Sequence, residues 1–267
     1  MIRKGARWTI RTAATRWPVP TYATVGALAR ATAPLPAAGR LPEVLPELPP
    51  SELRRARRRL RSSEWRTRAL SVVMNTATGE PALPPFELEG TLPDQDRPAV
   101  YVSLHIGAMP TLAAFLRDLP REVAALHRMD WGLPSKVTGV YVARNEAARV
   151  AGFHRALATL RGGGHVFIPI EGDTVRVPLL GRSLLVARGP FALARLSGAP
   201  IVPLLARWSG GRARIHAGHP IAAGRDEQAM ALKLACELDR YLRAHPGEID
   251  DWLLKGLIDE HSPLPDL

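Results

Sequence analysis

A histidine and a glutamate each follow a short apolar run, and together they could move a proton. His105 comes directly after Ala-Val-Tyr-Val-Ser-Leu (99–104), and Glu171 comes directly after Val-Phe-Ile-Pro-Ile (166–170). A histidine oriented by a carboxylate is a common general base at neutral pH. If both runs are neighbouring strands of an open α/β sheet, they end at the edge where such sheets bind ligands. We therefore predict an acid–base pair of His105 and Glu171.

Each of these residues also has a structural interpretation. A single histidine at a strand end often makes only a structural hydrogen bond. Glu171, Gly172 and Asp173 are predicted to form an acidic turn, whose carboxylates could cap the turn, bind a metal ion or hold the histidine. Gly107 would let a substrate approach the backbone after His105. No His-x3-His or His-Glu-x-x-His spacing occurs, so we predict no zinc site.

Several arginines near these runs are candidates for holding an anionic substrate. Gly181-Arg182 is predicted to be a loop that presents a guanidinium group, which binds phosphate or carboxylate well. Arg188 precedes Gly189-Pro190, a pair typical of a helix start, where exposed amides bind anions. Ordinary surface ion pairs are the alternative for each arginine. Arg144 precedes the helix predicted at 145–160 and is a further candidate. The candidate substrate-binding residues are thus Gly107, Arg144, Asp173, Arg182 and Arg188.

The order of apolar and amphipathic segments predicts the fold that must position these residues. From residue 98 onward, short apolar strands alternate with amphipathic helices, which is typical of βα units in an α/β fold. A further block, 209–221, is expected to form one or two antiparallel edge strands. The strands are predicted at 99–104, 122–126, 165–170 and 200–206, and the helices at 109–118, 145–160, 189–197 and 226–244.

The remaining histidines and the one cysteine are expected to have structural or solvated positions. Cys236 lies in the last predicted helix, where we expect a small buried residue, and a single cysteine excludes a disulfide within the chain. The histidines are expected at a strand end (His127), on a helix surface (His154), at a strand start facing a turn (His165) and in an edge hairpin (His216 and His219).

The amino-terminal part of the chain differs from the rest in composition. Residues 1–50 are rich in proline and are predicted to form linkers and short surface turns, with the main domain at 51–267. Ser51 could cap a helix that ends near residue 77. Eight arginines between Arg54 and Arg68 would cover most of this helix, and its inward stripe would consist of Leu53, Leu60, Leu70 and Val73.

The charge of the chain predicts an anionic partner. The 267 residues carry a formal net charge of +11. The arginine-rich helix could be a solvated face, could bind anionic lipid headgroups, or could bind nucleic acid, which the lack of interleaved aromatics disfavours. Trp8, Trp17 and Trp65 favour a membrane surface. We find no spanning segment or clear signal peptide, so we expect a peripheral protein at the cytoplasmic face of the cell membrane.

The motifs also resemble those of a known family. The run 164–205 contains the acidic turn, Leu180-Gly181-Arg182, Gly189-Pro190 and Gly198-Ala-Pro-Ile-Val-Pro203. It resembles the bacterial lipid A late acyltransferases (lauroyl/myristoyl type) of the lysophospholipid acyltransferase superfamily. The strand-His-x-Gly segment at 99–107 fits the first motif of that family, and 240–253 resembles its closing helix. The resemblance covers about residues 50–255.

This resemblance implies a fold and a reaction. The fold would be a glycerolphosphate-acyltransferase-like mixed sheet flanked by helices, with a basic helical layer at the amino terminus. The reaction would move a fatty acyl group from an acyl carrier protein or coenzyme A thioester to a lipid or glycolipid hydroxyl, without a cofactor. His105 would be the general base, oriented by Glu171, and backbone amides after His105, with Arg182, would stabilise the developing negative charge.

One motif residue departs from the family pattern. The first motif is usually His-x4-Asp or His-x4-Glu, but Pro110 stands at the acidic position here. In some relatives, among them the mycobacterial phosphatidylinositol mannoside acyltransferases, a glutamate near the later strand end is implicated as the partner of the histidine, and Glu171 matches that place. Two hypotheses follow: an acyltransferase that uses Glu171, or a non-catalytic acyl-carrier- or lipid-binding relative.

Overall fold

The structure is a computed structural model that describes residues 12–14, 16, 18–32, 41–76, 83–90, 92–127, 137–141 and 146–258. Its strands are β1 (Phe86–Gly90), β2 (Val100–Ser103), β3 (Val123–His127), β4 (Val137–Tyr141), β5 (His165–Pro169), β6 (Glu171–Leu179), β7 (Arg182–Val186), β8 (Ile201–Ser209), β9 (Arg212–Ala217) and β10 (Leu257–Ile258). Its helices are α2 (Pro18–Thr32), α3 (Leu41–Val44), α4 (Pro50–Thr76), α5 (Leu112–Asp118), α6 (Glu146–Arg161), α7 (Gly189–Ser197), α8 (Glu227–Ala244) and α9 (Asp251–Gly256), with the 3-10 turns η1 (Met109–Thr111) and η2 (Pro246–Glu248).

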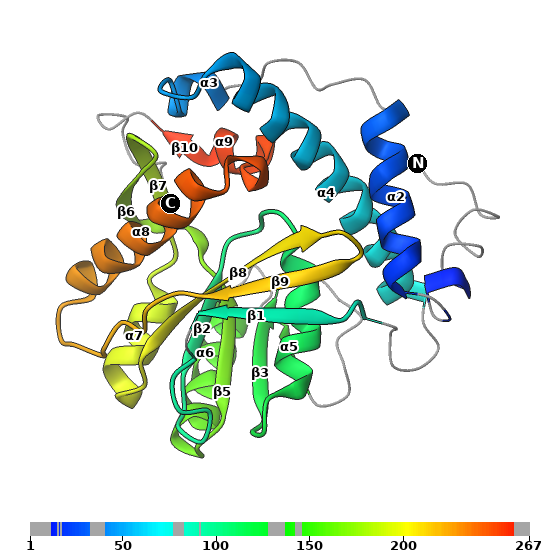
Figure 1. The fold of residues 1–267 in the computed structure, drawn as a ribbon. Coiled ribbons are helices and arrows are strands. Elements are labelled where there is room, and N and C mark those ends of the chain that lie inside the picture. Colours follow the sequence, from blue (N-terminus) through cyan, green and yellow to red (C-terminus); the bar gives the residue numbers. More distant parts are fainter. Residues whose placement is uncertain are drawn as a thin grey trace.

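A seven-stranded mixed sheet lies at the centre of the fold, in the order β1-β9-β8-β2-β5-β3-β4 (Figure 1). Strands β8, β2, β5, β3 and β4 are parallel, and β9 runs antiparallel to β8. A second sheet of three strands has the order β10-β7-β6. The βα units predicted from residue 98 onward are confirmed, because each predicted strand and helix is present close to its expected bounds.

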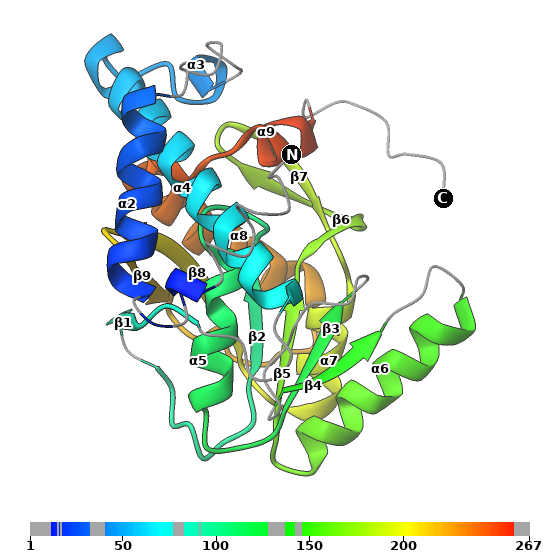
Figure 2. The same ribbon diagram turned by 90° about the vertical axis from the view of Figure 1, so that its right-hand side faces the viewer.

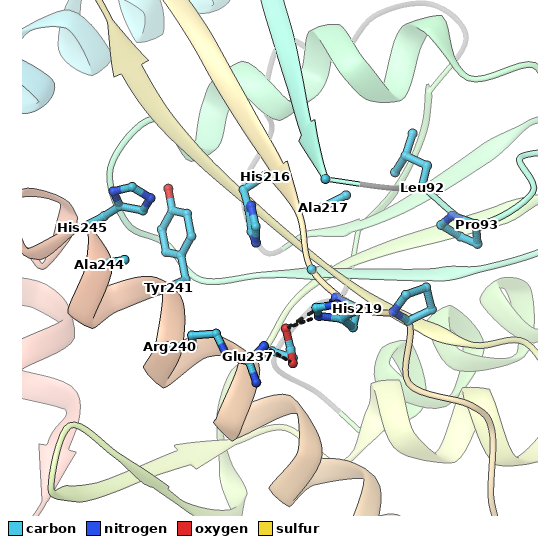
Figure 3. A pocket seen from close by; sticks show the side chains of 13 residues that line it. Leu92, Pro93, His216, Ala217, His219, Glu237, Arg240, Tyr241, Ala244 and His245 are labelled. Atoms are coloured by element: carbon cyan, nitrogen blue, oxygen red, sulfur yellow. Dashed lines mark hydrogen bonds and ion pairs between the residues drawn. The ribbon is translucent and has the colours of Figure 1, made fainter.

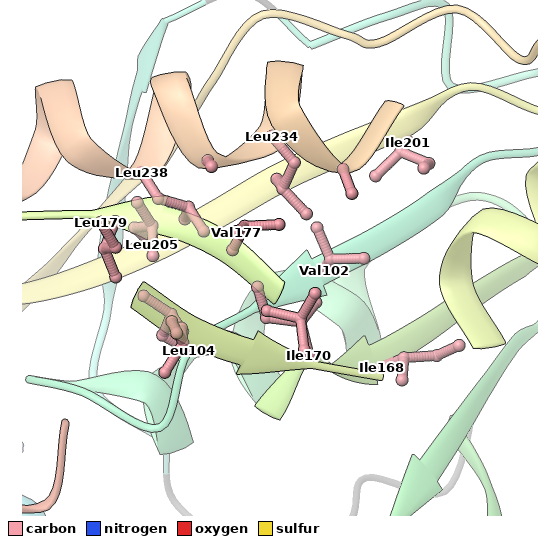
Figure 4. Close-up of a cluster of buried hydrophobic side chains, with 14 of the residues drawn as sticks. Val102, Leu104, Ile168, Ile170, Val177, Leu179, Ile201, Leu205, Leu234 and Leu238 are labelled. Carbon is pink, nitrogen blue, oxygen red and sulfur yellow. The ribbon is translucent and has the colours of Figure 1, made fainter. Parts of the chain in front are cut away.

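Helices cover both faces of the central sheet. Figure 2 shows α5 on one side of the strands and α6 on the other. Val100 and Val102 of β2 face the cluster that includes residues of α6, α7 and α8, whereas Tyr101 faces the cluster with α2, α5 and the later part of α4. Val177 and Leu179 of β6 pack into the first cluster, which fixes the small sheet to the core (Figure 4).

Two features of the prediction differ in the structure: a predicted turn is a strand, and a predicted edge strand is covered by another strand. Glu171–Asp173 is not a turn, because Glu171 begins β6 and pairs with Val186 of β7, with a register shift before Val175. The 209–221 block does not end the sheet, because β1 pairs parallel with β9 and covers that edge. The strand β1 lies outside the strands predicted from the sequence.

The amino-terminal layer is more ordered than the sequence predicted. The expectation of short turns over 1–50 was wrong for α2, which packs along α4 and buries the Tyr22 side chain. The helix α4 begins at Pro50, one residue before the predicted cap Ser51. Its predicted inward stripe is at least partly buried, but Arg66 is buried too, and its Nε donates a hydrogen bond to the Tyr22 carbonyl oxygen. Among the described residues, no helix is long and apolar enough to cross a bilayer.

Candidate active site

His105 and Glu171 meet at the carboxyl edge of the central sheet. Strands β2 and β5 are parallel neighbours, with Ser103 opposite Pro169, and the Ile170 amide donates to the Ser103 carbonyl oxygen at 2.9 Å. Nδ1 of His105 lies 2.9 Å from Oε2 of Glu171, and the main-chain amide of His105 donates to Oε1 of the same carboxylate. The predicted pairing of these two residues is therefore confirmed as geometry. Their catalytic role stays a prediction.

This contact orients the imidazole toward a proton transfer. The His105 side chain is 41% exposed, whereas the Glu171 side chain is only 11% exposed. A carboxylate that accepts from Nδ1–H fixes the tautomer in which Nε2 carries the lone pair. The arrangement can thus present a basic nitrogen at the surface while its orienting acid lies below it.

The backbone after His105 is held by hydrogen bonds with α4 and β8. The Thr67 hydroxyl of α4 donates to the Gly107 carbonyl oxygen at 3.0 Å, and the Ala108 amide donates to the Ala206 carbonyl oxygen of β8 at 3.0 Å. Gly107 has a φ of +53°, and a Cβ there would lie 2.3 Å from Oε2 of Glu248. The packing of Glu248 therefore requires a glycine at position 107. This differs from the prediction that Gly107 leaves space for a substrate.

Glu248 is a neighbour of the site that the sequence did not indicate. Its carboxyl group is buried and accepts a hydrogen bond from the Ser63 hydroxyl at 3.3 Å. Burial raises the pKa of Glu248 to about 8, and the hydrogen bond from Ser63 and the charges of Arg207 and Arg59 act in the opposite direction. The group lies in the closing motif at 240–253, but only the fold brings it to Gly107.

The end of the closing motif also reaches the site. Asp250 caps α9 by accepting a hydrogen bond from the Leu253 amide at 2.8 Å. The pKa of Asp250 is raised to about 6, mainly by burial and also by the negative charges of Glu64 and Glu171, against the hydrogen bonds from the Leu253 and Trp252 amides. Trp252 lies in the first turn of α9, and the centroid of its ring is 5.6 Å from that of the His105 ring.

The candidate substrate-binding arginines do not form one site. Arg182 begins β7 and pairs with Glu43 at 3.2 Å, whereas Arg188 follows the other end of β7 and pairs with Glu227 at 2.5 Å. The two arginines thus lie at opposite ends of β7, and their positions do not support a joint role in holding one anionic substrate. Asp173 is exposed in β6 and accepts a hydrogen bond from its neighbour Thr174. Arg144, Trp8 and Trp17 lie outside the described residues.

Three histidines line a cavity of 470 Å³ beside α8, and His105 is not among its lining residues (Figure 3). Nδ1 of His219 lies 3.1 Å from Oε2 of Glu237. The Tyr241 ring packs between the rings of His216 and His245, at centroid distances of 5.3 Å and 4.6 Å. Burial lowers the pKa of His216 and of His245, so both favour the neutral form. Within the described part of the chain, no group of three or more His, Cys, Asp and Glu residues could hold a metal ion.

Two smaller predictions were wrong. Cys236 is exposed on α8 rather than buried, because the buried positions of that helix are its neighbours Leu234, Ala235 and Leu238. His165 begins β5 as predicted, but it is fully buried rather than facing a turn, and its ring lies 5.3 Å from that of Tyr101. Burial lowers the pKa of His165.

The comparisons with known proteins give a weak structural similarity. The chain matches no protein-family model and no curated protein. Its structure is similar to the crystal structure of the 1-acyl-sn-glycerophosphate (LPA) acyltransferase PlsC from Thermotoga maritima, with a TM-score of 0.40 and 14% sequence identity. The similarity covers 91% of this chain and 100% of that chain. Similarity at this level does not decide an activity.

Proposed function

We propose that this chain transfers a fatty acyl group from a thioester, on acyl carrier protein or coenzyme A, to a hydroxyl group of a lipid or glycolipid. The observation that carries the proposal is the 2.9 Å contact between Nδ1 of His105 and Oε2 of Glu171 at the carboxyl edge of the sheet. A carboxylate-oriented, partly exposed imidazole suits the activation of a hydroxyl group.

The proposed reaction is a direct transfer. Nε2 of His105 takes the proton of the acceptor hydroxyl as its oxygen attacks the thioester carbonyl carbon. The tetrahedral intermediate then collapses, the carbon–sulfur bond breaks, and the imidazolium returns the proton to the leaving thiolate. Glu171 stabilises the imidazolium through its contact with Nδ1. The chain contains no Gly-x-Ser-x-Gly elbow, so no serine acyl-enzyme of that type is proposed.

The loop after His105 contains candidate donors for the developing oxyanion. The amide of His105 donates to Glu171 and the amide of Ala108 donates to Ala206. Between them lie the amides of Ile106 and Gly107, and we assign oxyanion stabilisation to these two. Arg182 is not assigned to this role, because it pairs with Glu43.

The acceptor and the place of reaction are part of the same proposal. The exposed arginines of α4 form a basic face that would bind an anionic membrane surface, which would bring a lipid acceptor to the site. This face consists of Arg54, Arg55, Arg58, Arg59 and Arg68. We propose peripheral attachment at the cytoplasmic face of the membrane, tested by sedimentation with vesicles that contain or lack anionic lipid.

The test of the proposal is thiol release from acyl-coenzyme A and from acyl carrier protein, with hydroxyl-bearing lysolipids and glycolipids as acceptors. We expect His105→Ala to lower turnover by at least roughly 100-fold, and Glu171→Gln to lower it strongly as well. His154, which is exposed on α6, supplies the control His154→Ala with unchanged turnover. Equal turnover in wild type and both site variants, with their folding intact, would reject the proposal. Association with the carrier or with vesicles without product would favour the non-catalytic binding relative instead.

A further inference from the structure

Helix α9 is firmly attached to the part of the fold that carries Glu171. Asp250 caps its first turn, and Leu253 and Leu254 are buried in the core. The following strand β10 pairs with β7, with Leu257 opposite Leu184, and β7 in turn pairs with the start of β6 at Glu171. The backbone at residue 252 is therefore fixed relative to the His105–Glu171 pair.

The side chain on this fixed backbone is an exposed indole. Trp252 is 51% exposed, and its ring lies 5.6 Å from the His105 ring at an interplanar angle of 65°. Other large apolar side chains with comparable exposure, such as Leu196 and Leu232, lie on α7 and α8. A half-exposed tryptophan on a fixed backbone beside the imidazole is well suited to bind an apolar group, because indole has a large apolar surface.

We infer that Trp252 packs against the first methylene groups of the donor's acyl chain and so holds the thioester carbonyl beside His105. This inference rests on the acyl transfer proposed above. In the reacting arrangement, the acceptor oxygen and the thioester carbonyl carbon both lie next to Nε2 of His105. The acceptor is polar around its hydroxyl group, whereas the acyl chain is apolar from its second carbon onward. An indole at this distance therefore fits the acyl side better.

The probe is the phosphopantetheine arm that both thioester donors share, carrying an S-alkyl ether of 4, 8 or 12 carbons that cannot be cleaved. Binding is measured calorimetrically in buffer without vesicles, below the concentration at which the ethers aggregate. We expect Trp252→Ala to weaken binding roughly tenfold, from the loss of a few tens of Å² of apolar contact. The factor should be the same for all three chain lengths, because the contact is limited to the first methylene groups.

Matched variants separate this contact from general effects. Trp252→Phe should retain most of the affinity, and Leu232→Ala, at another exposed apolar position, should bind like wild type. Unchanged binding in Trp252→Ala overturns the inference, and so does a loss that grows with chain length, or a wild type that binds none of the ethers. An effect on activity that occurs only with vesicles also overturns it and would assign the indole to the membrane.

The failure of this inference can be distinguished from the failure of the proposed function. Thioester turnover that is insensitive to His105→Ala removes the reaction itself, whatever the ethers show. Turnover that depends on His105 but is indifferent to Trp252→Ala leaves the reaction in place and removes only the contact with Trp252. As a kinetic readout, we expect Trp252→Ala to raise the KM for the donor about tenfold, with a smaller change in kcat.

Discussion

Glu248 is a buried carboxyl group beside Gly107 of the His105 loop, and its charge state can be tested by substitution. Its side chain is buried against Gly107, and burial raises its pKa to about 8. The positive charges of Arg207, Arg59 and Arg66 act in the opposite direction without cancelling this effect. We therefore expect the folded chain to hold Glu248 largely protonated at pH 7.

This expectation has a defined effect on stability. A carboxyl group with a pKa of about 8 in the folded chain, against 4.5 as its ordinary value, binds a proton on folding at pH values between the two. Its contribution to stability is therefore full below pH 4.5 and is lost as the pH rises through 8. Between pH 7 and pH 9 the free energy of unfolding should fall by about 1.4 kcal/mol on account of this group alone.

The variant Glu248→Gln keeps the shape and an oxygen that can accept from Ser63, but it cannot titrate. Urea unfolding of wild type and variant at pH 7 and pH 9 should show the pH-dependent loss only in wild type. Asp173→Asn, at an exposed carboxylate, is the control and should leave the pH dependence unchanged. The reasoning is refuted if Glu248→Gln loses as much stability as wild type over this range, because Glu248 would then be ionised in the folded chain and held by the arginines around it.

Two further predictions concern the packing under the site. Gly107→Ala should lower the free energy of unfolding by at least about 3 kcal/mol in urea melts, since it combines a φ of +53° with a clash against Glu248. Gly198→Ala, with a φ of +77° and open space around it, should lower the free energy of unfolding by only about 1–2 kcal/mol. Equal losses in the two variants would contradict the clash with Glu248. Leu104→Ala should lower the free energy of unfolding by about 3 kcal/mol, because the Leu104 side chain is fully buried among the core residues of Figure 4. Leu196→Ala, at an exposed position, should lower it by less than about 0.5 kcal/mol. A similar loss in both variants would contradict the burial of Leu104.

The pairing of His105 with Glu171 could be predicted from the sequence because it depends on local patterns. Strands buried on both faces appear as short apolar runs, and neighbouring parallel strands end at the same edge of the sheet. The runs at 99–104 and 166–170 satisfy both conditions, and the structure places β2 beside β5. The prediction of this pairing therefore does not depend on the exact lengths of the helices between the two strands.

The other neighbours of the site could not be found in this way. Glu248 and Trp252 reach the His105 loop only because the segment after α8 returns to the site and β10 joins the small sheet beside β7. The strand character of Glu171 itself depends on pairing with Val186, which no local pattern indicates. Similarly, the burial of Arg66 is made possible by α2, whose Tyr22 carbonyl oxygen accepts its hydrogen bond.

The arrangement around His105 also explains how a His-x4-Pro sequence can keep an oriented imidazole. Pro110 lies in the turn η1, so the loop itself has no carboxylate at the position where relatives of the resembled family carry one. Glu171 contacts both the backbone and the ring of His105 from outside the loop. One of its carboxylate oxygens accepts a hydrogen bond from the His105 amide, and the other contacts Nδ1. The loop does not need an acid of its own to be ordered, because hydrogen bonds with Thr67 and Ala206 already fix the backbone at Gly107 and Ala108. An acid at position 110 would therefore be redundant for orienting the ring, and Pro110 at that position does not by itself remove the proposed base.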